Sequence, residues 1–525
     1  MVEDGGNGMG EYVFELYRNI ALLQSYGFSL GDALESIGIK NVNIFGMGEM
    51  GRILLGNITN KIYICGLYDS AVKDERKIQI NNNSYTVLPA KKIDNNNVVM
   101  IVTPVNSYKE ILDELLQNGY ERKKIFSLNI IIKLCLEKIR QEHNELKKTS
   151  ISITNKQFLI TGAQFYNKGA QSMLFITVDE IRKRYDNAII WYYPLDNEKY
   201  YSKQITDKYN FLFLLDGDTK VSSLSDVEAN LDGIIDISGY ALASFPKWQW
   251  NVEMYIKMLK ISYTYNIPMC IMPQSFGPLD FNPYLHAELR MLLSNVKVIF
   301  AREKEGYKLL KQKFDLKNVE LSPDLVLQNR LLNKQNVYMK NIVDEIPNIK
   351  ENAVAIIPNI NNYEFMSPEK IINMYKHIIE KLQEKGKIIY ILLFDKDKKC
   401  CDDIVNNIQN KSDVEIISKE LDCFEYGNII AKFEFVIASR YHSIIHAYRL
   451  AVPVIAIGWA EKYLELLKLF EQSKYNFDIR NELVINEVLD AIDDIDNNLK
   501  QNQFLINKTM LEIQKNNCFD VLNDL

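Results

Sequence analysis

The sequence lacks any hydrophobic run long enough to cross a membrane. Its most apolar windows, residues 98–105 and 130–136, are short, and Lys133 interrupts the second. A spanning helix needs about 20 predominantly apolar residues. The amino-terminal segment has neither a basic start nor an apolar core, which argues against a secretory signal. We therefore expect a cytoplasmic protein, whose only association with membranes would be peripheral.

The chain also lacks a basic excess and any paired-cysteine motif. Its 62 Lys and Arg against 68 Asp and Glu give a net charge of −6, so there is no basic footprint for nucleic acid. The seven cysteines are scattered and have no C-x-x-C spacing, which is typical of reduced thiols in the cytosol.

Histidine is scarce, with five in 525 residues. His143, His286 and His377 lie in helical stretches away from any motif. His442 and His446 have H-x-x-x-H spacing, which could indicate a metal. No acidic residue follows at a recognised metal-site spacing, so we predict no metal site.

What the sequence does contain predicts an α/β fold. A length of 525 residues suggests about three domains, by a soft prior of ~150 residues each. Short β-branched runs alternate with helical patterns throughout the chain. We predict three Rossmann-like domains, over residues 1–140, 156–330 and 350–525. A charged, solvated helix and linker (136–156) and a polar connector (328–352) would separate them.

The first domain carries a glycine-rich turn in the context of a dinucleotide site. Strand 41–45 leads into GMGEMG, with Gly46, Gly48 and Gly51 at the entry to a helix, and Asp69 lies 23 residues after the first glycine. Such glycines allow close approach to a pyrophosphate, and the acid can meet a ribose hydroxyl. Two interpretations remain open: bound NAD(P) or another nucleotide, and a structural or regulatory appendage that keeps the turn without a cofactor.

The most informative stretch is 433–459, FEFVIASRYHSIIHAYRLAVPVIAIGW. It predicts a strand, a turn, a helix and a second strand, which places Arg440, His442 and Ser443 where a strand ends and a helix begins. Ligands of open α/β sheets bind at such strand ends. A guanidinium, a helix N-terminus and an imidazole together suit an anion and proton transfer. Alternatively, Ser439 only caps the helix and Arg440 only pairs with a carboxylate.

These residues resemble the signature of the polysaccharide pyruvyl transferase family. The resemblance runs from about Lys156 to the C-terminus. Six segments carry it in the family's order: TGAQFYNKGAQSML, DGIIDISGYALAS, IMPQSFGP, FAREKEGYKLL, SPDLVL, and SRYHSIIHA with AVPVIAIGW after it. It implies a GT-B-like arrangement of the last two domains around a cleft, with phosphoenolpyruvate as donor and no required cofactor.

The resemblance adds further site residues, each with a structural alternative. It implies Arg302 as a second cation for the donor, where the alternative is a surface ion pair. It implies that Asn167 and Gly169 bind a ligand. Alternatively, these residues only form a tight turn before a helix. Gln274 and Ser275 suit sugar hydroxyls, or they satisfy the backbone of their own turn.

One segment departs from the family. Many members carry a run of glycines where this chain has SGYALAS, so the side chains of Tyr240 and Leu242 would narrow the cleft.

The resulting hypothesis is transfer of a pyruvyl group from phosphoenolpyruvate to saccharide hydroxyls, forming a ketal on a cell-surface polysaccharide or its lipid-linked precursor. Arg440 and Arg302 would hold the donor's anionic groups and His442 would transfer a proton. The alternatives are a GT-B glycosyltransferase that uses a nucleotide sugar, and a non-catalytic sugar- or nucleotide-binding protein. The partners are the donor and a saccharide. A homo-oligomer is compatible with the sequence, which does not define the oligomeric state.

Overall fold

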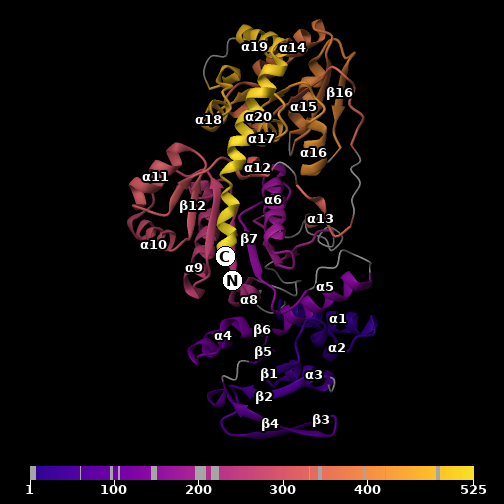
Figure 1. Ribbon diagram of the computed structural model, residues 1–525, viewed down its shortest axis with the longest axis vertical. Coiled ribbons are helices and arrows are strands. Elements are labelled where there is room, and N and C mark those ends of the chain that lie inside the picture. The colour runs from indigo at the N-terminus through magenta and orange to yellow at the C-terminus, as the bar shows by residue number, and fades with distance from the viewer. Residues whose placement is uncertain are drawn as a thin grey trace, which may run out of the picture.

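The protein folds into three α/β domains that are stacked along its long axis (Figure 1). The computed structural model describes residues 8–58, 61–94, 98–104, 107–143, 151–195, 208–214, 224–329, 332–340, 346–394, 397–419, 421–480 and 485–525. Residues 144–150 and 341–345, which belong to the two expected connectors, lie outside these ranges. No helix within the ranges has the length and apolar character that a bilayer crossing requires.

The N-terminal domain contains a six-stranded sheet in the order β3-β4-β2-β1-β5-β6. All neighbouring strands are parallel except the β3–β4 hairpin. The strands are β1 (Asn41–Phe45), β2 (Tyr63–Asp69), β3 (Arg76–Ile80), β4 (Asn83–Pro89), β5 (Val99–Val102) and β6 (Ile125–Ser127). The helices are α1 (Gly8–Ser25), α2 (Leu30–Ser36), α3 (Glu49–Asn57), α4 (Tyr108–Gln117) and α5 (Leu128–His143).

The middle domain contains a seven-stranded parallel sheet in the order β13-β12-β11-β10-β7-β8-β9. The strands are β7 (Gln157–Thr161), β8 (Ile189–Tyr193), β9 (Leu212–Phe213), β10 (Gly233–Asp236), β11 (Met269–Gln274), β12 (Val298–Ala301) and β13 (Val319–Leu321). The helices are α6 (Lys168–Arg184), α8 (Leu224–Val227), α9 (Gln249–Tyr265), α10 (Pro283–Ser294), α11 (Lys304–Phe314), α12 (Leu325–Gln328) and α13 (Lys334–Val337), with 3-10 turns η4 (Glu228–Asn230) and η5 (Pro246–Trp248).

The C-terminal domain repeats the pattern with a six-stranded parallel sheet, β16-β15-β14-β17-β18-β19. The strands are β14 (Ala353–Ile357), β15 (Ile388–Leu392), β16 (Val414–Ile417), β17 (Val436–Ala438), β18 (Val454–Gly458) and β19 (Asn476–Asp478). The helices are α14 (Pro368–Glu384), α15 (Lys398–Asn407), α16 (Cys423–Ile430), α17 (Tyr441–Arg449), α18 (Glu461–Leu469), α19 (Ile485–Asn497) and α20 (Leu499–Lys515), with 3-10 turns η6 (Ile360–Glu364) and η8 (Cys518–Asp524).

The strand orders place a topological switch point in the middle and C-terminal sheets. In the middle sheet the order reverses between β7 and β10, and in the C-terminal sheet between β14 and β17. A crevice opens where strand order reverses, outside the carboxyl ends of the strands. Loops that follow all four strands line one pocket between the two domains. The predicted fold class, three Rossmann-like domains with the last two in a GT-B-like arrangement, is confirmed.

The middle sheet separates two apolar cores. Leu159 and Trp191 on one face belong to a core that continues into the N-terminal domain. Phe158, Ile160 and Tyr192 on the other face belong to a core that continues into the C-terminal domain. Successive strand residues point to opposite faces, so strands such as β7, β8, β10, β11 and β12 contribute to both cores, whereas the edge strand β13 contributes only Val319 to the first. The middle domain is therefore fixed to its neighbour on each side.

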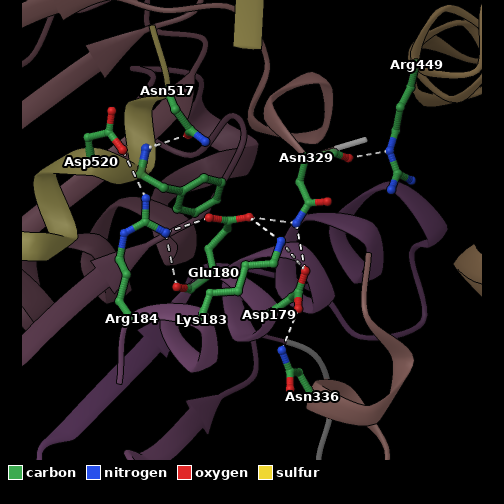
Figure 2. A network of polar contacts seen from close by, with 10 residues as sticks. Asp179, Glu180, Lys183, Arg184, Asn329, Asn336, Arg449, Asn517 and Asp520 are labelled. Atoms are coloured by element: carbon green, nitrogen blue, oxygen red, sulfur yellow. Dashed lines mark hydrogen bonds and ion pairs between the residues drawn. The ribbon is translucent and has the colours of Figure 1, made fainter. Parts of the chain in front are cut away.

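Two further connections tie the middle and C-terminal domains together. Helix α20 leaves the C-terminal domain and runs beside the middle domain, where η8 packs against α6 and β11 (Figure 1). The segment after α12 carries Asn329 and Asn336, whose amides donate to Asp179 of α6 at 2.8 Å each (Figure 2). Arg449 at the end of α17 donates to the carbonyl of Asn329 at 2.5 Å.

Helix α5 differs from the solvated helix that its charge density predicts. Leu136 is 3% exposed and Ile139 is fully buried, because α5 packs against α1, α2 and α8. Lys133, which interrupts the apolar run, donates from Nζ to the carbonyl of Phe213 at 2.8 Å and lies over the ring of Trp191. The charged residues of this helix thus surround an apolar stripe that joins the first two domains.

Candidate active site

A pocket of about 390 Å³ lies between the middle and C-terminal domains. It is lined by loops at the carboxyl ends of strands from both sheets, including those that follow β7, β10, β12, β14, β17 and β18. Its titratable basic residues are Arg302, Arg440, His442 and Lys462, and no Asp or Glu is among the described residues that line it. A pocket that is lined by basic side chains and by no acidic ones attracts an anion.

Arg440 occupies the N-cap position of α17, directly after β17. Its Nε and Nη2 donate to Oδ2 and Oδ1 of Asp397 at 2.7 and 2.6 Å. Asp397 is fully buried and also accepts the backbone N–H of Ile360 at 2.8 Å. A bidentate pair of this kind fixes the plane of the guanidinium. Ser439 does not cap the helix, because its hydroxyl pairs with that of Tyr375 at 2.8 Å.

Arg302 follows β12 on the opposite wall and is more than a surface ion pair. Its side chain is 5% exposed and donates to Glu303 at 2.8 Å and to Asp324 at 2.7 Å. The guanidinium also lies 4.8 Å from the centre of the Tyr441 ring, which belongs to the other domain. The carboxylates of Glu303 and Asp324 therefore hold the Arg302 guanidinium at the pocket wall.

His442 packs directly against Gly169 of α6. A Cβ atom at position 169 would lie 2.1 Å from Nδ1 of His442, so only glycine leaves room for the imidazole. His442 Nε2 has no hydrogen-bond partner in the described part of the chain and lies 3.9 Å from Asp324. Burial, with repulsion from Arg302 and Lys462, lowers the pKa of His442 to about 4, although Asp324 opposes the shift. The imidazole is therefore neutral near pH 7 in the free protein.

Lys462 completes the cationic lining, and the sequence analysis missed it. Its ammonium lies 5.1 Å from the ring centre of Tyr441 and 5.9 Å from that of Tyr463. Burial and the nearby Arg302 lower its pKa to about 8, so it is mostly protonated at neutral pH. The signal was present: Lys462 lies just after β18, which neighbours β17, so the rule that selected Arg440 also selects the end of the next strand.

Two helix N-termini meet at the pocket. Asn167 lines the pocket and caps α6, since its Oδ1 accepts the N–H groups of Gly169 and Ala170 at 3.1 Å each. Helix α17 begins on the opposite side at Tyr441. Each helix start contributes a partial positive charge, which adds to the field of Arg302, Arg440 and Lys462.

Other predicted residues lie behind this lining. Gln274 is fully buried and donates to Asp236 at 2.9 Å. The hydroxyl of Ser275 accepts from Arg302 at 2.6 Å and donates to Glu303 at 2.8 Å. Ser443 is fully buried, and its hydroxyl has no partner within the described ranges. None of Gln274, Ser275 and Ser443 lines the pocket, so the geometry gives the first two a supporting position beneath it.

The SGYALAS segment forms part of the wall. Ser238, Gly239 and Tyr240 line the pocket. Leu242 does not, because it is fully buried in the core of the middle domain. The expected narrowing therefore comes from Tyr240, and the expectation for Leu242 was wrong.

The glycine turn of the N-terminal domain is closed on itself. Gly46 has φ +92° and packs against Pro104, while a Cβ at Gly51 would lie 2.0 Å from the carbonyl oxygen of Gly46. Asp69 accepts the N–H of Met47 at 2.7 Å. Glu49 lies in the first turn of α3, and its carboxylate accepts the hydroxyl of Tyr17 at 2.7 Å. The helix start thus carries its own anion, and Gly48, the turn's N-cap, is exposed. Binding of NAD(P) or a nucleotide here stays a prediction.

His446 belongs to the core and not to the pocket. It is 1% exposed, and its Nε2 shares a hydrogen bond of 2.8 Å with Ser172. Across the described segments, no three His, Cys, Asp or Glu side chains gather into a group that could hold a metal ion.

Fold and pocket together define a class: a GT-B-like α/β protein with a cleft between its last two domains that is lined by basic residues. The sequence profile of the family described as polysaccharide pyruvyl transferase matches residues 167–461, which is more than half of the chain. The chain therefore belongs to the polysaccharide pyruvyl transferase family. No curated protein sequence matches it.

Solved structures with a similar arrangement are distant in sequence. A UDP-GlcNAc 2-epimerase from Neisseria meningitidis is 12% identical, with 70% of this chain and 98% of that chain covered and a TM-score of 0.43. A UDP-GlcNAc 2-epimerase from Methanocaldococcus jannaschii is 13% identical, covering 64% and 92%, with a TM-score of 0.41. A glycosyltransferase from Rickettsia africae is 9% identical, covering 71% and 96%, with a TM-score of 0.42. Similarity at this level says nothing about the activity of this chain.

Proposed function

We propose that the protein transfers the pyruvyl group of phosphoenolpyruvate to two hydroxyls of a saccharide, forming a pyruvate ketal on a cell-surface polysaccharide or its lipid-linked precursor. The observation that carries the proposal is the convergence of Arg302, Arg440, His442 and Lys462 on one pocket, with no Asp or Glu among the described residues of its lining. Membership of the family supplies the reaction class.

The charges of the donor match those of the pocket. The carboxylate and the phosphate of phosphoenolpyruvate are attached to the same carbon. Both groups stay anionic while positive charge develops at that carbon. Arg302 and Arg440 approach from opposite walls, each already held in plane by buried carboxylates. Such preorganised cations stabilise a transition state without reorganising. Lys462 is assigned to the same anions.

The reaction balances without a further reactant. A proton adds to the methylene carbon, and the first sugar hydroxyl adds to the adjacent carbon. The enol phosphate C–O bond then breaks and phosphate leaves. A second hydroxyl of the same sugar then closes the ketal. Of the two protons that the hydroxyls release, one balances the proton taken up by the methylene carbon and the other ends on the phosphate.

His442 is assigned to proton transfer. Neutral in the free protein, it can accept a proton from the attacking hydroxyl, and a bound anion would raise its pKa enough for it to act as an acid. Lys462 has a pKa of about 8, which lies closer to neutrality than the pKa of about 4 of His442. It is therefore the second candidate for the proton that reaches the methylene.

The test measures phosphate release from phosphoenolpyruvate with a panel of saccharides, and the mass of the product. We expect release only with a suitable saccharide, and a product that carries the mass of a pyruvate ketal. His442→Ala should lower turnover by about 100-fold or more, the usual range for losing a general acid or base. Arg440→Lys keeps the charge but loses the bidentate fork, and should also lose most turnover. His377→Ala, on the surface of α14, is the matched control.

Full turnover in both site variants would remove the assigned roles. Consumption of a UDP-sugar without phosphoenolpyruvate would identify a glycosyltransferase instead. Saturable saccharide binding with no turnover across the panel would identify a non-catalytic binding protein.

A further inference from the structure

The pocket has a second wall whose chemistry differs from that of its cationic part. The chain contains four tryptophans. Trp191 is buried in the core, and Trp248 and Trp459 line the pocket, one from each domain. The anionic donor is matched by cations and not by indole rings. We therefore expect Trp248 and Trp459 to contact a different ligand.

Trp248 is held in place by aromatic neighbours. Its ring meets that of Tyr240 edge-on, with centroids 4.5 Å apart, and that of Phe245 at 5.5 Å. The Tyr240 hydroxyl donates to the carbonyl of Gly277 at 2.5 Å, which fixes the supporting ring. A preoriented indole loses little entropy when a ligand stacks on it.

Trp459 lies on the other domain, close to the cationic residues. Its ring stacks on Phe365 at 4.8 Å, with the planes 14° apart. The ammonium of Lys462 lies 5.8 Å from its centre. Trp459 therefore marks the border between the cationic part of the pocket and the aromatic part.

Three side-chain amides line the pocket together with Trp248 and Trp459, and these five side chains form the uncharged wall of the lining. Gln164, Asn251 and Asn361 line the pocket, and none of their amides has a hydrogen-bond partner within the described ranges of the chain. Each amide offers two donors and an acceptor. Aromatic faces for an apolar surface, beside uncommitted amides for hydroxyls, form a site for a neutral polyhydroxylated ring.

We propose that this wall is the acceptor subsite, in which a sugar ring stacks on Trp248, hydrogen-bonds the three amides, and points its reacting hydroxyls past Trp459 toward His442. The inference rests on the proposed function, because it assigns the acceptor half of the same pocket. Tyr240 acts as a positioning residue that fixes Trp248. The acceptor is thus recognised by an uncharged face, and the negative charges of the complex lie at the opposite end of the pocket.

The test separates saccharide binding from donor chemistry in the full-length protein. Direct binding is measured on an array of short oligosaccharides with terminal hexoses and N-acetylhexosamines, without phosphoenolpyruvate. Turnover is then measured with the oligosaccharide that binds best, and phosphoenolpyruvate affinity by calorimetry. The variants are Trp248→Ala, Trp248→Phe and Trp250→Ala. Trp250, two residues away on α9, is 51% exposed and does not line the pocket, which makes it the matched control.

We expect Trp248→Ala to weaken saccharide binding and raise its KM by about tenfold, a typical loss for an aromatic anchor. Its phosphoenolpyruvate affinity should stay within about twofold of the wild type, because the cations are unchanged. Trp248→Phe should recover most of the loss, since a ring remains, and Trp250→Ala should behave as the wild type.

Each other result has one meaning. An unchanged saccharide affinity and KM in Trp248→Ala would overturn the subsite while leaving the proposed function in place. Loss of phosphoenolpyruvate affinity in that variant would overturn it too, because the wall would then serve the donor. Absence of saccharide binding by the wild type across the array would overturn it as well. Trp248-dependent saccharide binding with no consumption of phosphoenolpyruvate would retain the subsite and refute the pyruvyl transfer.

Discussion

At the scale of single residues, the site depends on how closely two side chains from different domains approach. Gly169 on α6 and His442 on α17 are in contact because the glycine has no Cβ. The sequence analysis expected this glycine to bring the backbone close to a ligand. The structure shows that it brings the backbone close to the imidazole, which then lies at the pocket wall.

Gly169→Ala tests this contact. The new methyl carbon would stand 2.1 Å from Nδ1 of His442, so the imidazole must move. A displacement of about 1 Å in a catalytic group costs roughly 100-fold in rate, and we expect that fall in turnover. The helix itself should not lose stability, because alanine favours helix over glycine.

The control is Gly48→Ala in the N-terminal domain, where no atom lies within 4 Å of the added carbon. Its turnover should match that of the wild type. Equal turnover in Gly169→Ala would show that His442 needs no fixed position.

The protonation of His442 gives a second prediction at this scale. Its pKa of about 4 in the free protein lies below the ordinary value of 6.5, so the imidazole is neutral at pH 5.5. A bound carboxylate and phosphate favour the imidazolium and raise that pKa. Binding of phosphoenolpyruvate at pH 5.5 should therefore take up a proton at His442, and affinity should rise as the pH falls toward 5.

Calorimetry in two buffers of different ionisation enthalpy measures this uptake. The phosphate of the donor also titrates near pH 6, so the informative quantity is the difference between the wild type and His442→Gln. The same proton uptake in both proteins would mean that the bound anion does not act on the imidazole.

At the scale of secondary structure, the sequence predicts strands and their ends better than it predicts pairing. The run before Ser439 is β-branched and apolar, and it forms β17 (Val436–Ala438), the first strand expected in the stretch 433–459. The sequence does not predict which side chains pair with one another. Asp397 fixes Arg440 from 43 residues away, and Arg302 reaches Tyr441 across the cleft. The packing of one domain creates the first contact and the docking of two domains creates the second, and no local sequence pattern records either.

Charge density is a second source of error at this scale. It predicts that residues 136–156 face water, but the buried stripe of α5 repeats with helical spacing among the charges. Polar type likewise suggests that Gln274 and Ser275 face a ligand. Their partners, Asp236 and Glu303, are also polar, so composition does not distinguish a supporting hydrogen bond from a binding one.

The polar network of α6 yields a prediction about elements. Asp179 is fully buried and accepts from Asn329 and Asn336, and it pairs with Lys183 at 2.8 Å (Figure 2). Asp179→Ala would remove one hydrogen bond from each of the two buried amides, while Asn329 Nδ2 keeps its second acceptor, Glu180, at 2.8 Å. Each such hydrogen bond contributes about 1 kcal/mol, so we expect the free energy of unfolding to fall by about 2 kcal/mol, measured by urea denaturation.

The matched control is Glu512→Ala on α20. Glu512 pairs with Lys515 at 2.8 Å, but both side chains are more than 60% exposed, and such pairs contribute about 0 to 1 kcal/mol. If the two variants unfold at the same urea concentration, the network does not hold α6 to the segment after α12.

At the scale of the whole molecule, the N-terminal domain lies at the far end from the C-terminal domain (Figure 1). None of its described residues lines the pocket. Its contacts are with the middle domain, where Asn230 donates to the carbonyl of Ile125 at 2.7 Å and Lys123 pairs with Asp232. Because Leu224 and Val227 of α8 are buried in the core that both domains share, the N-terminal domain covers apolar surface of the catalytic body.

Deletion of residues 1–140 tests that structural role. Removing the domain would expose Leu224, Val227 and part of the Trp191 face, and exposed apolar patches of this kind cause association. We expect the shortened chain to aggregate, measured by size-exclusion chromatography with light scattering. The same deletion with Leu224→Ser and Val227→Ser should be more soluble and should retain saccharide-dependent phosphate release, because every residue of the pocket remains. A soluble, monodisperse deletion without those substitutions would contradict the shared core. A soluble form that releases no phosphate would show that the N-terminal domain shapes the cleft from a distance, through the sheet that separates the two cores.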